Sequence, residues 1–338
     1  MQQTISIPAI SIVIPTYNIE NYINQCLETV LSQTFKDFEV IVIDDYSTDR
    51  TVEVIESYQS RFDGRLRLYK FPKNTNDGAA TPKNFGLHHA RGKYVIFIDG
   101  DDLLTANALN DFITAAEKFQ ADLVFPESFI RFSDQGRLPK QSEIQIQYQR
   151  KPEIRVKEPT LVGSSPVDKV RQYIAGEVSD FYWSKFTRRE FLLDHEIEFS
   201  KMPVRHDSIF SFSCFVLGRS VRIPTIANGY RIGRKNANSG REGKWDETKI
   251  RKWLCDILMG TRDLRNFCQS LEIFAQDLRL EYDVINWFLR HEFALSSPQI
   301  YSSETPERIK QILIAEALKD PVGFIPVFAQ IFNMANGK

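Results

Sequence analysis

Short apolar runs alternate with amphipathic stretches through the first 126 residues of the chain. The runs at residues 10–14, 38–43, 66–71, 94–98 and 121–125 are rich in β-branched and aromatic side chains, which predicts buried strands. Between them, residues 20–32, 48–58, 81–91 and 105–115 carry apolar side chains at helical spacing. Strands that alternate with helices in this way are joined by right-handed crossovers, so the first third of the chain predicts a parallel sheet.

The pattern changes after residue 126. Residues 142–150 alternate between apolar and polar side chains, which predicts an antiparallel strand, and Ser165 with Pro166 predicts the start of a helix. From residue 245 onward, apolar side chains recur at helical intervals and predict a helical C-terminal region. Residues 321–334 are unusually apolar, and we rank packing on the rest of the chain above self-association and above contact with a membrane surface.

Composition narrows the classes of function. The 338 residues include 43 basic and 44 acidic side chains, so no overall positive field favours nucleic acid. The four cysteines lack metal-ligand spacing and predict reduced thiols. The first residues resemble a strand more than a signal peptide, and no apolar run reaches the roughly 20 residues of a membrane span. These features predict a cytoplasmic protein that holds any anionic ligand in a local site.

Three acidic residues follow one of the predicted strands. Asp99, Asp101 and Asp102 come directly after residues 94–98, where the strand leaves the core. Adjacent carboxylates repel one another, and oxygen ligands of this kind suit Mg²⁺ or Mn²⁺. A solvated acidic turn explains the same residues without a ligand. The glycine-rich motifs of the two commonest nucleotide sites are absent, so a nucleotide would have to be bound through carboxylates and a metal.

Five segments in succession resemble the family 2 glycosyltransferases, which have the GT-A fold. They are Ile-Val-Ile-Pro-Thr-Tyr-Asn at residues 12–18, Leu-Ser-Gln-Thr-Phe at 31–35, Val-Ile-Asp-Asp-Tyr-Ser-Thr-Asp at 42–49, Pro-Lys-Asn-Phe-Gly at 82–86 and Gly-Lys-Tyr-Val-Ile-Phe-Ile-Asp-Gly-Asp-Asp at 92–102. Each segment is weak alone, but their order and spacing over residues 9–126 are specific. The resemblance implies an α/β, Rossmann-like GT-A fold with a mostly parallel sheet and flanking helices, and an inverting, metal-dependent transfer from a nucleotide sugar.

The resemblance places a nucleotide pocket at the ends of the first two strands. Asp45 matches the carboxylate that accepts a hydrogen bond from the uracil ring in family members, and a carboxylate can only accept. Pro15, Thr16 and Tyr17 line the same pocket by analogy. A turn that leads into a helix is the alternative interpretation of Asp45 and the aspartate before it.

The resemblance also assigns the acidic cluster. Asp99 and Asp101 match the Asp-x-Asp that holds the ribose and the metal on the diphosphate, with Asp102 as a further metal ligand. The metal is expected to be Mn²⁺ or Mg²⁺, which stabilises the charge that develops on the leaving diphosphate. Lys83 lies just inside a helix predicted to begin with Thr81 as its N-cap, where it either approaches the donor or is a solvated lysine.

The second part of the chain resembles the acceptor side of the same family. Asp207 matches the catalytic base, and His206 stands where the family usually has Glu. Trp183 and Lys185 match a Trp-x-Lys segment and are expected to contact the acceptor, as is His206, although aromatic residues there are often core. A basic, glycine-rich segment contains Arg231 and Arg234. These arginines are expected to clamp the donor phosphates, and the alternative is a segment that is merely exposed.

We therefore expect a GT-A domain at residues 1–244, with a nucleotide-sugar half at 1–126 and an acceptor half at 127–244, followed by a helical region at 245–338. The expected activity moves a sugar from a UDP-sugar to a hydroxyl of a glycan, lipid-linked or polyol-phosphate acceptor in cell-surface polysaccharide synthesis. The expected location is the cytoplasm, with peripheral membrane association or homo-oligomerisation through the C-terminal helices left open. The alternatives are an inactive glycan-binding scaffold on the same fold and a sugar nucleotidyltransferase.

Overall fold

The computed structural model describes residues 7–132, 156–201, 206–231, 245–303 and 306–317, with the backbone alone for residues 293–303, 306 and 317. The predicted strand at residues 142–150 lies outside these ranges. So do Arg234 and the apolar segment at residues 321–334.

Strands and helices alternate through the first part of the chain, as predicted. The elements are β1 (Ile10–Thr16), α1 (Ile23–Leu31), β2 (Phe38–Asp44), α2 (Thr51–Tyr58), β3 (Leu66–Lys70), α3 (Ala80–His89), β4 (Tyr94–Phe97), β5 (Leu103–Leu104), α4 (Ala108–Phe119) and β6 (Leu123–Phe132). The second part contains β7 (Thr160–Val162), α6 (Pro166–Ile174), β8 (Phe186–Arg188), α7 (Arg189–Asp194), α8 (His206–Leu217) and β9 (Ser220–Arg231). Four helices complete the described chain: α9 (Glu247–Gln269), α10 (Glu272–Gln276), α11 (Leu278–Ser303) and α12 (Pro306–Ala317).

Among the described residues, nine strands form one mixed sheet with the order β3-β2-β1-β4-β8-β6-β9-β5, and β7 pairs with β9. The strands from β3 to β4 are parallel, which confirms the predicted parallel sheet. Beyond β4 the directions are mixed, because β8 runs antiparallel to both β4 and β6 while β6 and β9 are parallel. The sheet therefore has a parallel half, from β3 to β4, and a mixed half, from β8 to β5.

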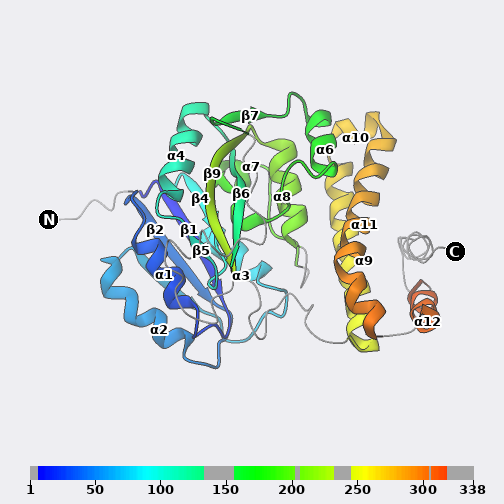
Figure 1. Ribbon diagram of the computed structural model, residues 1–338, viewed down its shortest axis with the longest axis horizontal. Helices are drawn as coiled ribbons and strands as arrows, with labels where there is room; N and C mark the ends of the chain where they lie inside the picture. Colours follow the sequence, from blue (N-terminus) through cyan, green and yellow to red (C-terminus); the bar gives the residue numbers. More distant parts are fainter. Residues whose placement is uncertain (1–6, 133–155, 202–205, 232–244, 304–305, 318–338) are drawn as a thin grey trace.

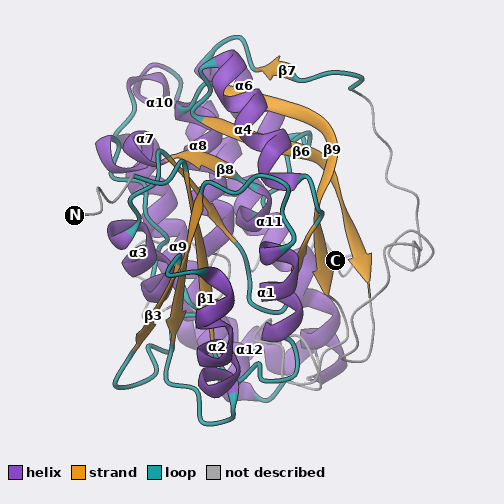
Figure 2. Cartoon of the chain, turned by 90° about the vertical axis from the view of Figure 1, so that its left-hand side faces the viewer, coloured by secondary structure: helices purple, strands orange, loops and turns teal. Residues whose placement is uncertain are grey.

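Helices cover both faces of the sheet (Figures 1 and 2). Side chains of α1, α2 and α4 form one core with alternate strand residues such as Ile12 and Val42. Val13 and Phe97, which point to the opposite face, belong to a second core with side chains of α3, α6, α8, α9 and α11. Because the strands are buried on both faces, they read as continuous apolar runs in the sequence.

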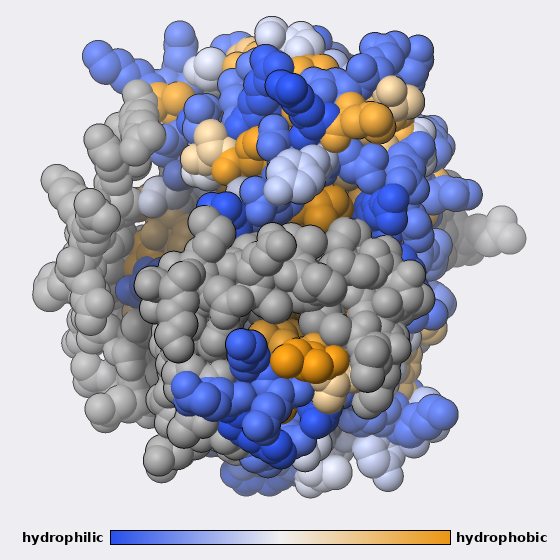
Figure 3. Space-filling model, turned by 90° about the vertical axis from the view of Figure 1, so that its right-hand side faces the viewer, coloured by the Kyte–Doolittle hydropathy of each residue, from blue (hydrophilic) through white to orange (hydrophobic). Residues whose placement is uncertain are grey.

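The C-terminal helices form part of this second core. Leu254 of α9, Phe288 of α11 and Ile312 of α12 are buried in it together with sheet residues. On the outer face of this region, the described side chains are mainly hydrophilic, and apolar ones form small separate groups (Figure 3). Among the described residues, no helix is long and apolar enough to span a membrane. The division at residue 244 stays a prediction.

The predicted start of α3 is wrong. The helix begins at Ala80, and its N-cap position is Ala79, with a left-handed φ of 78°. Thr81 lies inside the first turn, where its backbone N–H donates to the carboxylate of Asp77 at 3.1 Å. The Asp77 side chain therefore takes the capping role that the sequence pattern gave to Thr81, because it reaches the same free N–H groups from the preceding loop. The other start is confirmed, since Ser165 caps α6 by accepting from Asp168 N at 3.1 Å.

Candidate active site

The carboxyl ends of β1, β2 and β4 meet at one edge of the parallel half. Thr16, the last residue of β1, pairs in register with Asp44 of β2, and its hydroxyl donates to the Asp44 carboxylate at 3.1 Å. The other Asp44 oxygen accepts from the backbone N–H of Ser47 at 2.9 Å. Asp44 therefore anchors the turn after β2, which fixes the position of Asp45.

Asp45 lies beside a loop that arrives from β3. Its two carboxylate oxygens accept from the backbone N–H of Thr75 at 2.9 Å and from the Thr75 hydroxyl at 2.8 Å. Burial raises the pKa of Asp45, and these hydrogen bonds oppose the increase. Pro15 and Thr16 are buried next to it, whereas Tyr17 is 37% exposed. The sequence analysis did not identify Thr75, because a threonine in a polar loop carries no signal of its own.

The acidic cluster follows β4 and is held by Arg231 from the end of β9. The Arg231 backbone N–H donates to Asp102 Oδ1 at 2.8 Å, and Arg231 Nε donates to the carbonyl of Asp101 at 2.7 Å. A third bond joins its guanidinium to Gln25 of α1 at 2.6 Å. Arg231 is buried, between the rings of Tyr22 and Phe132. In this structure Arg231 is buried and holds the acidic turn, whereas we expected it either to clamp donor phosphates or to lie in an exposed loop.

The acidic cluster fits a hard divalent cation that shares its ligands with a diphosphate. Among the described residues, no group of three or more carboxylate, histidine or cysteine side chains is arranged to hold a metal by itself. Mg²⁺ is usually held by one or two carboxylates together with waters and phosphate oxygens, so such a closed cage is not required. Asp99 is partly exposed, and Asp99, Asp101 and Asp102 all act electrostatically on the thiol of Cys26. One strand end therefore gathers three carboxylates, with a solvent-accessible one among them.

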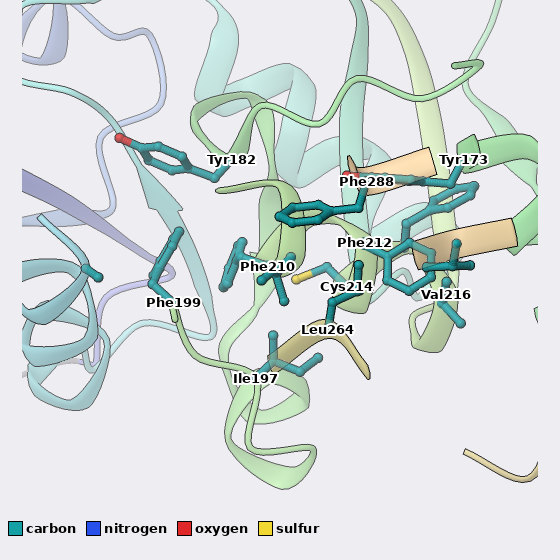
Figure 4. Close-up of a cluster of buried hydrophobic side chains, with 14 of the residues drawn as sticks. Tyr173, Tyr182, Ile197, Phe199, Phe210, Phe212, Cys214, Val216, Leu264 and Phe288 are labelled. Atoms are coloured by element: carbon teal, nitrogen blue, oxygen red, sulfur yellow. The ribbon is translucent and has the colours of Figure 1, made fainter. Parts of the chain in front are cut away.

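Tyr182 joins this cluster to the mixed half of the sheet. Its hydroxyl donates to Asp99 Oδ1, and its side chain is buried. Figure 4 shows Tyr182 at the edge of an aromatic cluster, with its hydroxyl directed away from that cluster. Burial and the neighbouring carboxylates raise the pKa of Tyr182 well above its usual value, so the phenol stays a donor. No sequence pattern points to Tyr182, because it lies 83 positions from Asp99 along the chain.

Lys83 lies under Tyr182 and is almost completely buried. Its ammonium is 3.5 Å from the centre of the Tyr182 ring, which is a favourable cation–π arrangement. Burial lowers the pKa of Lys83 to about 8, and the carboxylates of Asp99, Asp207 and Asp77 oppose the decrease. Lys83 is 2% exposed, so here it is neither a solvated lysine nor open to a ligand from the solvent side.

His206 receives the Lys83 ammonium at the start of α8. Lys83 Nζ lies 2.7 Å from His206 Nε2, and a charged ammonium can only donate, so this imidazole nitrogen is the acceptor. Asp207 follows in the first turn of α8, partly exposed, where the helix dipole favours its charged form. The family's usual Glu at position 206 is thus replaced by a side chain that also offers an acceptor to Lys83.

Trp183 and Lys185 shape the segment before β8. Trp183 is buried and stacks on Phe181 and Tyr230, with ring centres 5.0 and 5.4 Å apart. Lys185 is completely buried, and its ammonium donates to the carbonyls of Ser179 and Phe181 at 2.7 and 3.0 Å. Burial lowers the pKa of Lys185 to about 8. In this structure both side chains are buried and hold the segment together.

Comparison with known proteins places the chain in a family. The model of the family described as "Glycosyl transferase family 2" matches residues 11–215. The uncharacterized glycosyltransferase EpsJ of Bacillus subtilis (strain 168) is 31% identical over 240 residues, which are 69% of this chain and 63% of EpsJ. This chain therefore spans less than two thirds of that relative.

Solved structures agree on the fold. TarS 1–349 of Staphylococcus aureus, in complex with UDP-GlcNAc, superposes with a TM-score of 0.63 at 20% identity, over 97% of this chain and 91% of that chain. In sequence, TarS of S. aureus (strain Mu50 / ATCC 700699) is a poly(ribitol-phosphate) beta-N-acetylglucosaminyltransferase, 34% identical over 116 residues, which are 34% of this chain and 20% of TarS. The mannosyltransferase PcManGT of Pyrobaculum calidifontis, in complex with GDP-Man and Mn²⁺, has a TM-score of 0.52 at 16% identity, covering 98% of this chain and 88% of that chain. The family match, which covers more than half of the residues, and the GT-A architecture together show that this chain belongs to glycosyl transferase family 2.

Proposed function

We propose that this protein is an inverting, metal-dependent glycosyltransferase that moves a sugar from a UDP-linked donor to a hydroxyl of a polyol-phosphate or glycan acceptor. The observation that carries the proposal is the arrangement around Lys83 and Tyr182. Asp99, at the expected diphosphate end, and Asp207, the expected base, both act electrostatically on these two buried side chains. Two carboxylates with different proposed roles therefore lie close to the same pair of buried side chains.

In the proposed mechanism, the parallel half binds the donor. Asp45 accepts a hydrogen bond from the uracil N–H, and its contacts with the partly buried Thr75 hold its carboxylate in one orientation. Asp99, Asp101 and Asp102 would hold Mn²⁺ or Mg²⁺, which would neutralise charge on the departing diphosphate. Tyr182 fixes the orientation of Asp99, and Arg231 fixes the turn that carries the other two.

Asp207 supplies the base. It takes the proton of the acceptor hydroxyl as the oxygen attacks the anomeric carbon from the face opposite the diphosphate. The first turn of α8 and the nearby Lys83 ammonium both favour the charged form of Asp207. Attack from the opposite face in one step inverts the configuration at the anomeric carbon.

The choice of donor and acceptor classes is supported by the relatives. TarS is named for transfer of N-acetylglucosamine to poly(ribitol-phosphate), and its structure holds UDP-GlcNAc. For this chain we propose a UDP-sugar as the donor and a polyol-phosphate or a lipid-linked glycan as the acceptor. The proposed location is the cytoplasm, at the inner face of the membrane. A hexosyl or N-acetylhexosaminyl group is the proposed cargo.

The test is thermal stability with UDP, GDP, CDP and dTDP, each with and without Mn²⁺. A ligand that binds only the folded state raises the melting temperature by mass action, so UDP with Mn²⁺ is expected to give the largest increase. Asp101→Asn should abolish the metal-dependent part of that increase, whereas Asp207→Asn should retain it and lose transfer. No increase with any nucleotide would contradict the proposed donor site and favour the glycan-binding scaffold.

A further inference from the structure

One carboxylate joins the C-terminal helices to the proposed active site. Asp180 Oδ2 lies 3.0 Å from Nε2 of His291 on α11, and it accepts from the hydroxyl of Ser208 at 3.1 Å. A carboxylate can only accept, so the His291 Nε2–H is the donor. The Asp180 side chain is 12% exposed and that of His291 32% exposed. Because Ser208 directly follows Asp207, His291 is two hydrogen bonds away from the residue next to the proposed base.

Aromatic packing fixes His291 in this position. The His291 ring stacks on Trp287 with centres 5.2 Å apart, and Trp287 meets Tyr173 of α6 edge to face at 5.2 Å. The hydroxyl of Tyr173 donates to the backbone carbonyl of Ser208 at 3.1 Å. Figure 4 shows Phe288 of α11 beside Tyr173 and the side chains of α8. Helix α11 therefore reaches Ser208 by two routes, through Asp180 and through Tyr173.

The segment that carries Asp180 also carries residues of the donor side. Two positions after Asp180, Tyr182 donates to Asp99. The Lys185 ammonium draws the carbonyls on either side of Asp180 together, and the charge of Asp180 opposes the effect of burial on the pKa of Lys185. Residues 179–185 therefore form one hydrogen-bonded unit. A displacement of Asp180 would move Tyr182 with it.

We propose that His291 is a positioning residue of the transfer reaction, and that α11 thereby completes the active site. Through Asp180, His291 holds the start of α8, with its base Asp207, in a fixed relation to Tyr182 and the carboxylate that Tyr182 binds. This inference rests on the proposed function. A misplacement of about 1 Å between reacting groups costs on the order of 100-fold in rate, so one hydrogen bond at this position has a large effect.

The test compares His291→Leu and His291→Gln with a matched control. Leucine keeps much of the side-chain volume and removes the donor, whereas the Gln amide nitrogen replaces Nε2 and keeps the donor. The control is His88→Leu, because His88 forms a similar pair with Glu198 at 2.6 Å on the exposed surface of α3. Two readouts are needed: the steady-state kinetics of transfer from a UDP-sugar, and amide hydrogen exchange of residues 179–185.

We expect His291→Leu to lower kcat roughly tenfold or more while the KM for the donor changes less than about twofold, since Asp45, Asp101 and Asp102 keep contacts that lie outside residues 179–185. Exchange of residues 179–185 should become faster in the same variant. His291→Gln should recover most of both properties, and His88→Leu should behave like the wild type. If His291→Leu does not fold, Ser208→Ala, which removes the hydrogen bond from Ser208 to Asp180, replaces it with the same expected results.

The proposal is overturned if the Leu variant keeps the kcat and exchange of the wild type. It is also overturned if the Gln variant is as impaired as the Leu variant, because the volume of the side chain would then matter and the donor would not. A wild type without turnover on any UDP-sugar would instead contradict the proposed function. Faster exchange of residues 179–185 in the Leu variant would still support the link between α11 and that segment.

Discussion

The parallel and mixed halves of the sheet contribute to the site in different ways. In the parallel half, Asp45 directly follows β2 and Asp99 lies two residues after β4, so the backbone of the sheet places them. In the mixed half, Tyr182, Asp207 and Arg231 come from a short turn, a helix start and the end of a long strand. They reach the strand ends through contacts between distant parts of the chain, such as the bond between Arg231 and Asp101 across 130 positions.

The two halves also differ in charge. The parallel half places carboxylates at its strand ends, whereas the mixed half contributes the buried cations Lys185 and Arg231. Lys83 belongs to α3, but its ammonium points toward His206 and Tyr182 of the mixed half. The comparison indicates that the parallel half determines where the acidic groups lie. The mixed half orients Asp99 through Tyr182 and holds the turn at Asp101 and Asp102 through Arg231.

The largest expected effect is that of Asp207→Asn, which distinguishes the role of the mixed half from that of the parallel half. This change removes the proposed base without altering the donor carboxylates, so kcat should fall by about 10³-fold while UDP binding stays within roughly twofold. Asp101→Asn is the matched variant in the parallel half and should lose metal-dependent UDP binding. Turnover assays and titration calorimetry with UDP and Mn²⁺ measure both effects. Equal loss of UDP binding in the two variants would contradict the division of roles.

A smaller effect, on stability, is expected from Arg231→Met. Removing one partner of a buried charged network costs about 3 kcal/mol, because the Asp101 carbonyl and the Gln25 side chain lose their hydrogen bonds to the guanidinium. The control is Arg50→Met, whose ion pair with Glu20 is largely exposed, and which should cost less than about 1 kcal/mol. Urea unfolding measures the free energy of unfolding of each variant. A loss in Arg231→Met as small as in the control would mean that the acidic turn does not depend on the mixed half.

The same contrast explains how far the sequence could predict this molecule. The parallel half is encoded locally, since continuous apolar runs that end in acidic residues locate both the strands and Asp45 and Asp99. The mixed order of β8, β6 and β9 was not predicted, because strands of three to twelve residues pair there without a regular alternation with helices. Tyr182, Asp180 and His291 were missed, since their partners lie 28 to 111 positions away.

The environment of Lys83 could not be predicted from the local sequence either. The sequence places it correctly near the start of a helix, where lysines are usually solvated, but its neighbours Tyr182 and His206 are about 100 positions or more away. Only the packed structure shows that it is buried. The roles of the site residues stay predictions until variants are measured.

The smallest expected effect is the pH dependence of stability that the burial of Lys83 causes. In the folded state the pKa of Lys83 is about 8, below its usual value near 10.5, so between these values the unfolded chain binds more protons than the folded one. The contribution of Lys83 to the free energy of unfolding therefore increases as the pH rises through this range. The wild type should gain about 2 kcal/mol relative to Lys83→Met between pH 7.5 and 9.5, measured by urea unfolding at several pH values. Lys185 is present in both proteins, so its similar shift cancels in the comparison. A constant difference across this range would mean that the Lys83 ammonium keeps its ordinary pKa, and that the mixed half does not control its charge.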